Sequence, residues 1–313
     1  MSDEPVQLDI FRAAYADIPI RDQRDTMERP FFSLAKKPRR TPIEYSVNGV
    51  TVKVTPGEYG IATIWDADIL IWAATQITEA LDREGKVSRT IHFHPYQLLK
   101  AIRRQHGGDQ YRKLLDALRR LRTTDVETNI RPTHGRTKRG SFGWIDAWTA
   151  EESPDGDPFT MSITLSEWLY QGIIEEGGIL SIHEDYFLLT GGIERWLYRV
   201  ARKHAGKQQD GWRFTMRQLY EKSGSAARFS DFAIDIRKIV KADNLPEYAL
   251  SLSRNGEGEE IVEMVRRSVL HVSDTRYELP RNPRRRMGEG IRQPTSVFQA
   301  QDPPRGKGRK RGS

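Results

Sequence analysis

The feature that most constrains this sequence is the stretch from Lys86 to Trp144, where a strand-like run, two helical segments and a basic loop follow one another. The strand-like run is residues 90–94, the helical segments are residues 95–104 and 109–122, and Gly107-Gly108 separates the two helices. The stretch holds fourteen basic and four acidic residues, a balance of +10, whereas the whole protein carries +7. This order of elements is typical of a winged helix-turn-helix, and the concentrated positive charge favours a polyanionic partner.

The second helix of this stretch, residues 109–122, has one apolar side. Its apolar residues recur at steps of three and four, and they are Tyr111, Leu114, Leu115, Leu118 and Leu121. That stripe must face a core, so the other side chains point outward, where they can reach phosphates or guanine edges in a major groove. The predicted DNA contacts of this helix are Gln110, Arg112, Lys113, Arg119 and Arg120.

The elements on either side of that helix complete the motif. The supporting helix begins with Pro95, at a position where a missing amide proton costs nothing, and it adds Arg103 and Arg104 as contacts. The loop 131–140 joins the strand-like runs 124–130 and 141–148, and we interpret it as a wing. Its predicted contacts are Arg136, Lys138 and Arg139. A basic amphipathic helix alone is more often a solvated face, but a preceding helix, a glycine turn and a basic hairpin in this order favour nucleic-acid binding.

A second unit follows the same order of elements. Residues 195–241 hold twelve basic and four acidic residues, a balance of +8, and include a strand-like run at 212–215 and helices at 216–222 and 229–240. The loop 254–259 would be its wing, but this loop is acidic, so phosphate contacts should come from the helices. The predicted contacts are Arg217, Lys222, Arg228, Ser230, Arg237 and Lys238. The alternative is a unit that serves only dimerisation or scaffolding.

These patterns predict an α+β protein with two tandem winged helix-turn-helix domains and a basic tail. We expect an N-terminal arm at residues 1–28, a first domain at 29–150, a second at 151–275 and a tail at 276–313. Asn48-Gly49 between two β-branched runs predicts a hairpin, and residues 64–81 predict a core helix packed against it. The tail has a balance of +8 from Arg281 onward and lacks an apolar period, so we expect it to be disordered.

Three features that are absent from the sequence indicate the expected cellular location. It has no cysteine, which excludes disulfides and thiolate metal sites and suits a reducing cytoplasm. We see no export signal and no apolar run of membrane-spanning length. The expected location is therefore the cytoplasm, in association with the nucleoid or a plasmid.

Two segments resemble a known family. Residues 28–45, ERPFFSLAKKPRRTPIEY, and residues 60–74, GIATIWDADILIWAA, are similar to the replication initiator protein A family, which is found on plasmids of alphaproteobacteria and related elements. The similarity extends to about Val272. The resemblance implies a protein that binds repeated double-stranded DNA sites at a plasmid origin and recruits host replication proteins such as a helicase or initiator. It also implies repression of its own promoter, as a homodimer.

Three other functions compete with this interpretation. His92 and His94, on alternate positions of one strand, resemble the metal-binding motif of rolling-circle nicking nucleases, for which Tyr111 or Tyr198 would be the nucleophile. We find no third ligand, no P-loop and no cofactor motif, so the expectation is a non-enzymatic protein without a cofactor or metal. A transcriptional regulator with the same fold needs the same operator-binding chemistry and stays open. RNA binding is disfavoured because no aromatic platform on strands is evident.

Overall fold

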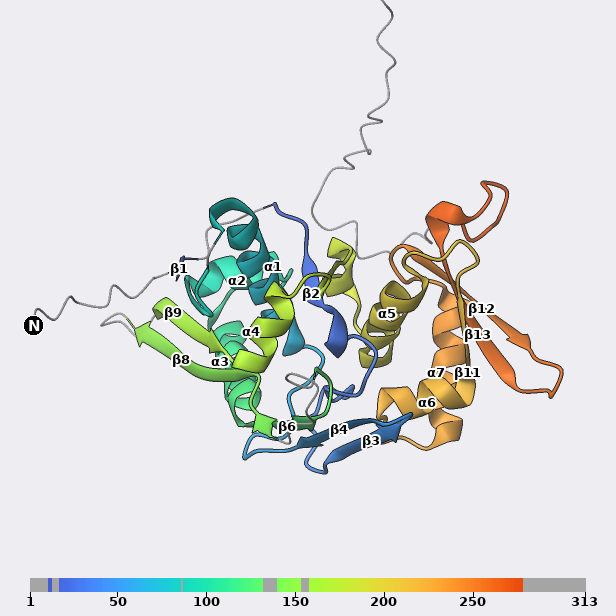
Figure 1. Ribbon diagram of the computed structural model, residues 1–313, viewed down its shortest axis with the longest axis horizontal. Helices are drawn as coiled ribbons and strands as arrows, with labels where there is room; N and C mark the ends of the chain where they lie inside the picture. The colour runs from blue at the N-terminus through green and yellow to red at the C-terminus, as the bar shows by residue number, and fades with distance from the viewer. Residues whose placement is uncertain (1–10, 13–16, 86, 132–139, 153–157, 278–313) are drawn as a thin grey trace, which may run out of the picture. The chain divides into compact units, whose positions relative to one another are not determined.

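The computed structural model describes residues 11–12, 17–85, 87–131, 140–152 and 158–277, with helices and strands mixed along the chain (Figure 1). All of these residues belong to one compact unit. The predicted disordered tail and the wing contacts Arg136, Lys138 and Arg139 lie outside the described residues. The mixed α and β content agrees with the sequence-based expectation.

The first half of the unit contains three helices and a four-stranded sheet. In chain order the elements are α1 (Ala67–Glu84), β5 (Thr90–Phe93), α2 (Pro95–Ala101), α3 (Gly108–Thr123), β8 (Ile145–Glu152) and β9 (Pro158–Leu165). The strand order is β1-β5-β9-β8, and β1 (Phe11–Arg12) pairs parallel to β5. The other pairs are antiparallel.

The second half repeats this arrangement. Its elements are α5 (Gly192–Ala205), β11 (Trp212–Thr215), α6 (Met216–Ser223), α7 (Phe229–Ala242), β12 (Tyr248–Arg254) and β13 (Glu260–Arg266). The strand order β11-β13-β12 corresponds to β5-β9-β8 in the first half, with the last strand in the centre both times. In the first half, two more strands, residues 125–128 and 141–142, lie between α3 and β8 and join another sheet. Apart from these two strands, both runs read helix, strand, helix, helix, strand, strand.

A further sheet takes up the strands on both sides of the loop 131–140, which is predicted as the first wing. Its strand order is β3-β4-β6-β7, formed by β3 (Ile43–Val47), β4 (Val50–Thr55), β6 (Asp125–Thr128) and β7 (Ser141–Phe142). The Asn48-Gly49 hairpin is confirmed, because β3 pairs with β4 and both turn residues have positive φ. The loop 131–140 does join two paired strands, β6 and β7, but these strands extend this sheet through β4.

The strands that complete the sheet beside α3 are β8 and β9, which pair with each other and, through β9, with β5. The boundary predicted between residues 150 and 151 falls inside β8, which pairs with β9 from Ile145 to Glu152. Between α3 and β8 the chain first adds β6 to the hairpin sheet, where the buried Val126 pairs with Val54.

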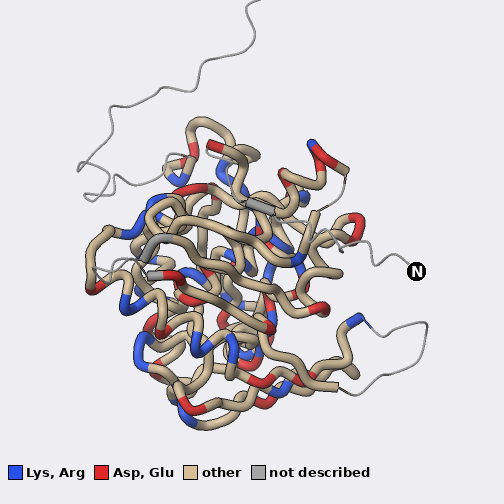
Figure 2. Tube along the Cα trace, turned by 90° about the vertical axis from the view of Figure 1, so that its left-hand side faces the viewer, with Lys and Arg blue, Asp and Glu red and all other residues tan. Residues whose placement is uncertain are grey.

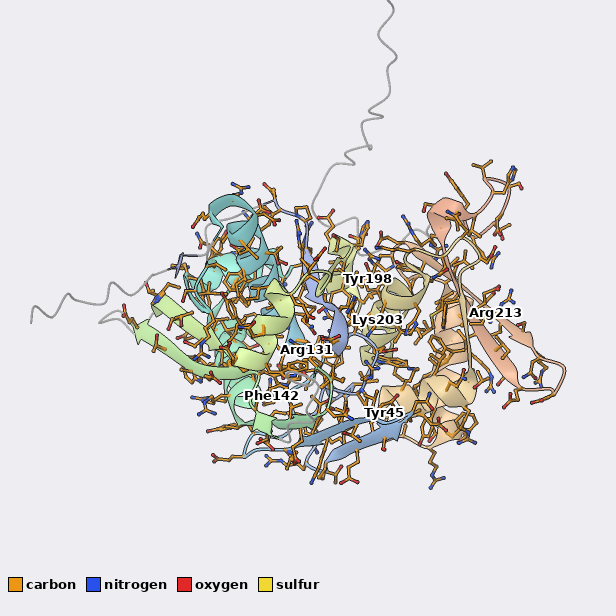
Figure 3. All side chains as sticks on the ribbon, in the orientation of Figure 1. Tyr45, Arg131, Phe142, Tyr198, Lys203 and Arg213 are labelled. Carbon is orange, nitrogen blue, oxygen red and sulfur yellow. The ribbon has the colours of Figure 1, made fainter. Side chains whose placement is uncertain are left out.

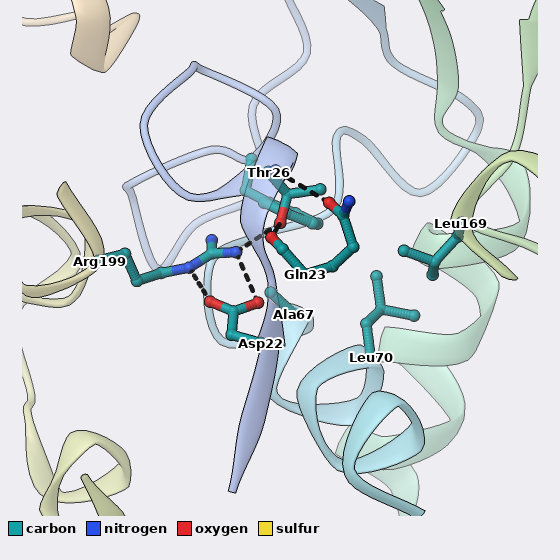
Figure 4. Close-up of a pocket in the computed structure, with 8 residues that line it drawn as sticks. Asp22, Gln23, Thr26, Ala67, Leu70, Leu169 and Arg199 are labelled. Atoms are coloured by element: carbon teal, nitrogen blue, oxygen red, sulfur yellow. Dashed lines mark hydrogen bonds and ion pairs between the residues drawn. The ribbon is translucent and has the colours of Figure 1, made fainter. Parts of the chain in front are cut away.

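The N-terminal segment is not a separate arm as far as residue 28, because β1 already pairs with β5 and the chain from Arg21 onward packs into the folded body. Strand β2 (Arg21–Gln23) pairs with β10 (Ile179–Ser181), and the 3-10 turn η1 (Arg24–Thr26) follows it. Asp22 accepts two hydrogen bonds from Arg199 of α5, at 2.6 and 3.1 Å, and Arg199 donates a third to Thr26 Oγ1 at 2.7 Å (Figure 4). This ion pair could not be predicted from local patterns, because the partners are 177 residues apart.

Two further described elements lie between the two halves in the sequence, α4 (Glu167–Ile174) and the 3-10 turn η3 (Glu184–Leu188). A third, the 3-10 turn η4 (Arg267–Val269), follows β13. One hydrophobic core runs through the unit, and it includes Trp72 of α1, Leu118 of α3, Trp196 of α5 and Ile236 of α7. Both helix-rich runs therefore pack into a single body.

Candidate nucleic-acid interface

The apolar stripe predicted for α3 is buried. Leu114, Leu118 and Leu121 are fully buried, and Tyr111 and Leu115 pack against the same core. On the opposite side, the Arg112 and Lys113 side chains are 78% and 59% exposed. An amphipathic helix with this stripe must present the residues at 112, 116, 119 and 123 to solvent, because they lie half a turn from the stripe.

The exposed cations of α3 have acidic neighbours on the same helix. Asp109 lies 3.6 Å from Arg112 and 2.6 Å from Lys113, and the hydrogen bond from Lys113 lowers the pKa of Asp109 below its usual value. Arg119 donates to Asp116 at 2.9 Å. Exposed pairs of this kind contribute little to stability, so a phosphate can replace the carboxylate. Figure 2 shows basic and acidic positions interspersed over the face turned toward the viewer.

Two predicted contacts, Arg104 and Arg120, point into the protein. Arg120 forms a two-pronged ion pair with Asp66, at 2.7 and 2.8 Å, and its side chain is 16% exposed. Burial alone would lower the pKa of Arg120, but the hydrogen bonds and charge of Asp66 raise it above the ordinary value. Arg104 binds Asp68 at 3.0 Å and the Trp65 carbonyl oxygen at 2.5 Å. Both arginines hold the start of α1, so we leave them out of the proposed interface.

The other two residues predicted around α2 and α3 lie at the surface to different degrees. Arg103 follows α2 with a positive φ of 56° and binds Glu184 at 2.5 Å, while its side chain stays 37% exposed. Gln110, in the first turn of α3, is half-buried. Both stay available at the edge of the α3 face.

The outward side of α7 lies opposite a buried stripe of Phe232, Ala233, Ile236 and Ile239. Lys238 is 72% exposed and lies 3.2 Å from Asp235 of the same helix. Arg237 makes a two-pronged ion pair with Glu260 of β13, at 3.0 and 2.5 Å, which ties α7 to the adjoining sheet. Arg228 and Ser230, at the beginning of α7, are exposed.

The two predicted contacts on α6 differ. Arg217 is exposed and its guanidinium carbon lies 4.0 Å from the Phe229 ring centroid, which positions it beside the beginning of α7. Lys222 instead donates to Glu28 at 3.2 Å. Glu28 is buried and also binds Arg29, Lys203 and His204, at 2.9, 3.1 and 2.6 Å; Lys203 is labelled in Figure 3. Lys222 therefore belongs to a buried charge cluster, and we leave it out of the interface as well.

A cationic segment that the sequence analysis did not assign to DNA lies between the two halves. Residues 36–40 read Lys-Lys-Pro-Arg-Arg. Arg39 donates to the carbonyl oxygen of Gly224, in the turn between α6 and α7, at 2.8 Å. Arg40 donates to the carbonyl oxygen of Glu58 at 2.7 Å, and the neighbouring Tyr59 ring lies 5.7 Å from the Arg119 guanidinium of α3.

This segment therefore touches the surroundings of both candidate DNA-binding helices, and Lys36, Lys37 and Arg40 are exposed. Four cations in five residues were visible in the sequence. Their position was not, because it depends on contacts with Gly224 and Glu58, which are distant along the chain.

His92 and His94, the candidate metal ligands of a nicking nuclease, have different positions in the structure. His92 pairs within the sheet opposite Ser162, whereas the Nδ1 atom of His94 accepts a hydrogen bond from the Tyr96 amide and caps α2. Within the described ranges, no three His, Asp or Glu side chains are grouped so that they could hold a metal ion. In the same ranges, no helix is both long and apolar enough to cross a membrane.

Comparisons with known proteins give the following likenesses. Residues 21–250 match the family described as Replication initiator protein A. A protein of Wigglesworthia glossinidia brevipalpis that is named as a replication protein is 36% identical over 231 residues, covering 73% of this chain and 83% of that one. The crystal structure of domains 2 and 3 of RctB covers 76% of this chain and 96% of that chain, with a TM-score of 0.55 and 12% identity. At this identity, the likeness to RctB shows a shared fold.

Proposed function

The chain belongs to the replication initiator protein A family, and from this premise we propose that it initiates plasmid replication by binding repeated double-stranded DNA sites at an origin. We propose that each half of the unit is a winged helix-turn-helix domain, with α3 and α7 as the helices that enter the major groove. We also propose that the protein recruits host replication proteins, represses its own promoter and forms a homodimer.

The repeated element order supports the two-domain interpretation. In helix-turn-helix proteins the second helix of the motif reads the groove and the first crosses the backbone. Here α2 and α3, and again α6 and α7, stand in this relation. The antiparallel pair β12 and β13 follows α7 directly, whereas β6 and β7 come between α3 and the corresponding pair β8 and β9. The proposed wings are the strand pair β8 and β9 in the first half and the strand pair β12 and β13 in the second.

One observation carries the DNA-binding proposal: the outer face of α3 exposes Arg112, Lys113 and Arg119, while its other face is fully packed. Arginine fits guanine O6 and N7 with two hydrogen bonds, and lysine neutralises phosphate. Arg217, Arg228, Ser230, Arg237 and Lys238 would make the corresponding contacts in the second half.

Footprinting the full chain on DNA that flanks its own gene tests the proposal. Protection of repeated sites that is lost on replacing both Arg112 and Arg119 with alanine is the expected result. Protection that is absent in the wild-type protein, or unchanged in the double variant, would contradict it. Deleting the gene from a minimal plasmid separates initiation from regulation, because loss of plasmid maintenance supports an initiator and mere derepression of a promoter supports a regulator.

We also propose that the protein acts without catalysis. The capping role of the His94 Nδ1 atom and the packing of Tyr111 against the core support this. Incubation with single-stranded origin DNA and manganese provides the test. A covalent protein–DNA adduct that disappears on replacing His92 with alanine would establish a nuclease instead.

A further inference from the structure

An isoleucine lies in the middle of the outward side of α7. Ile234 is 46% exposed, although its neighbours Phe232, Ala233 and Ile236 are buried. It is one turn after Ser230 and one turn before Lys238, so it lies on the side that faces away from the core. Cationic side chains border it at Arg237, Lys238 and Lys241, and acidic ones at Asp231 and Asp235.

The position of Ile234 differs chemically from the matching position on α3. The buried residues Leu114, Leu118 and Leu121 of α3 have the same spacing as Phe232, Ile236 and Ile239 of α7. Aligned in this way, Ile234 corresponds to Asp116, which is engaged with Arg119 at 2.9 Å. The two helices thus share a packing pattern but present different chemistry outward.

Major-groove chemistry restricts what an isoleucine can recognise. Base edges there are hydrogen-bond donors and acceptors, with one apolar group, the 5-methyl group of thymine. A β-branched side chain in a helix keeps largely one χ1 rotamer, so Ile234 is held in place before any contact forms. An apolar side chain would leave the polar edge of a G·C pair unpaired, which disfavours it at that position.

We propose that Ile234 is a specificity-determining residue that packs against the 5-methyl group of a thymine in double-stranded DNA. This inference rests on the proposed function, because it requires α7 to lie in a major groove. It makes the target asymmetric: the half bound by α7 contains an A·T pair recognised through its methyl group, whereas α3 recognises its half through charged and hydrogen-bonding side chains.

The test removes the methyl group from the DNA and leaves the protein intact. Duplexes that bind the full chain are first selected from a random-sequence pool, and each thymine is then replaced singly by deoxyuridine. At one or two thymines we expect wild-type affinity to fall about threefold to fivefold, the size expected for one buried methyl-sized group. Ile234→Ala should bind the unmodified duplex more weakly by a similar factor and should lose the response to deoxyuridine.

Val272→Ala is the matched control, because Val272 is an apolar β-branched residue that is 70% exposed and lies outside α7. This variant should keep the wild-type response to deoxyuridine. The inference would be overturned if the wild-type protein binds the selected duplexes but no deoxyuridine substitution affects it differently from Ile234→Ala. That result would leave the proposed function intact. Failure of the wild-type protein to select any duplex would instead overturn the proposed function.

Discussion

Asp68 of α1 accepts a hydrogen bond from Arg195 of α5 at 2.6 Å, and the two side chains are 0% and 3% exposed. Arg104, which follows α2, binds the other oxygen of the same carboxylate at 3.0 Å. Asp22 and Arg199 form a second buried pair. The first helices of the two proposed winged-helix domains are therefore joined by buried charge as well as by apolar packing.

Replacing Asp68 with asparagine should strongly destabilise the protein. The change leaves Arg195 buried without its counter-ion, and breaking a buried pair in this way costs about 3–5 kcal/mol. The free energy of unfolding in urea measures the effect. Asp82→Asn is the control, because Asp82 is 56% exposed and pairs with Arg21 at 3.4 Å, so its loss should cost at most about 1 kcal/mol. Equal effects of the two variants would contradict the importance of the buried pair.

Stability should fall in acid partly through Glu28. Burial alone would raise the pKa of Glu28, but the hydrogen bond with His204 and the charges of Lys203 and Lys222 lower it far below the usual 4.5. A depressed pKa in the folded state stabilises the protein fully above 4.5 and progressively less as the pH falls below that value.

Glu28→Gln should therefore lower the free energy of unfolding at neutral pH, and the difference from the wild type should shrink in acid. Urea unfolding of both proteins between about pH 3 and pH 7 measures this, over the range in which such carboxylates titrate. Glu44→Gln, which replaces an exposed carboxylate on β3, provides the control. A difference between Glu28→Gln and the wild type that stays constant over this range would refute the assignment.

Arg112→Ala and Arg119→Ala should each weaken specific DNA binding by about 1–3 kcal/mol if the arginine contacts a base. Titrations of a selected duplex and of an unrelated duplex measure the change in affinity and in sequence preference. Arg83→Ala removes an arginine of α1 that is 57% exposed, and it should leave both unchanged. Unchanged affinity in both α3 variants would exclude α3 as the recognition helix.

Lys36 and Lys37 should contact phosphate without reading sequence. Their joint replacement by alanine should reduce the slope of log affinity against log salt by about 2, because each phosphate contact releases about one counter-ion. Sequence preference should be preserved. Lys207→Ala is the control, because Lys207 is exposed but lies far from the cationic segment. The beginning of α5, at Gly192, lies against the Leu34 carbonyl oxygen just before that segment. Lys207 lies beyond the other end of α5, a helix about 21 Å long. An unchanged slope in the double variant would remove the segment from the interface.

Local patterns in the sequence predicted much of the secondary structure. The stripes of α3 and α7 and the Asn48-Gly49 turn were visible because they depend on residues a few positions apart. The direction of each arginine was not. Arg112 and Arg120 both lie off the apolar stripe, but Asp66, 54 residues before Arg120, draws that side chain inward.

The sheet that the strands flanking the loop 131–140 join could not be predicted for a similar reason, because strand pairing is decided by partners distant in the sequence. Strand β6 joins β4, and Val126 pairs with Val54 there. An alternating run of residues gives no information about which sheet will accept it. Ile234 was likewise overlooked, since an apolar residue on a helix is usually assigned to the core until its exposure is known.

The buried charges between α1 and α5 have a consequence for the architecture of the origin. Because α1 and α5 belong to one packed body, the proposed recognition helices α3 and α7 keep one separation and one rotational phase, so the number of base pairs between the two sequences that they would read is fixed. Inserting half a helical turn of DNA, about five base pairs, between the two sequences would place the second sequence on the opposite side of the duplex. One protein molecule could then not bind both sequences at once.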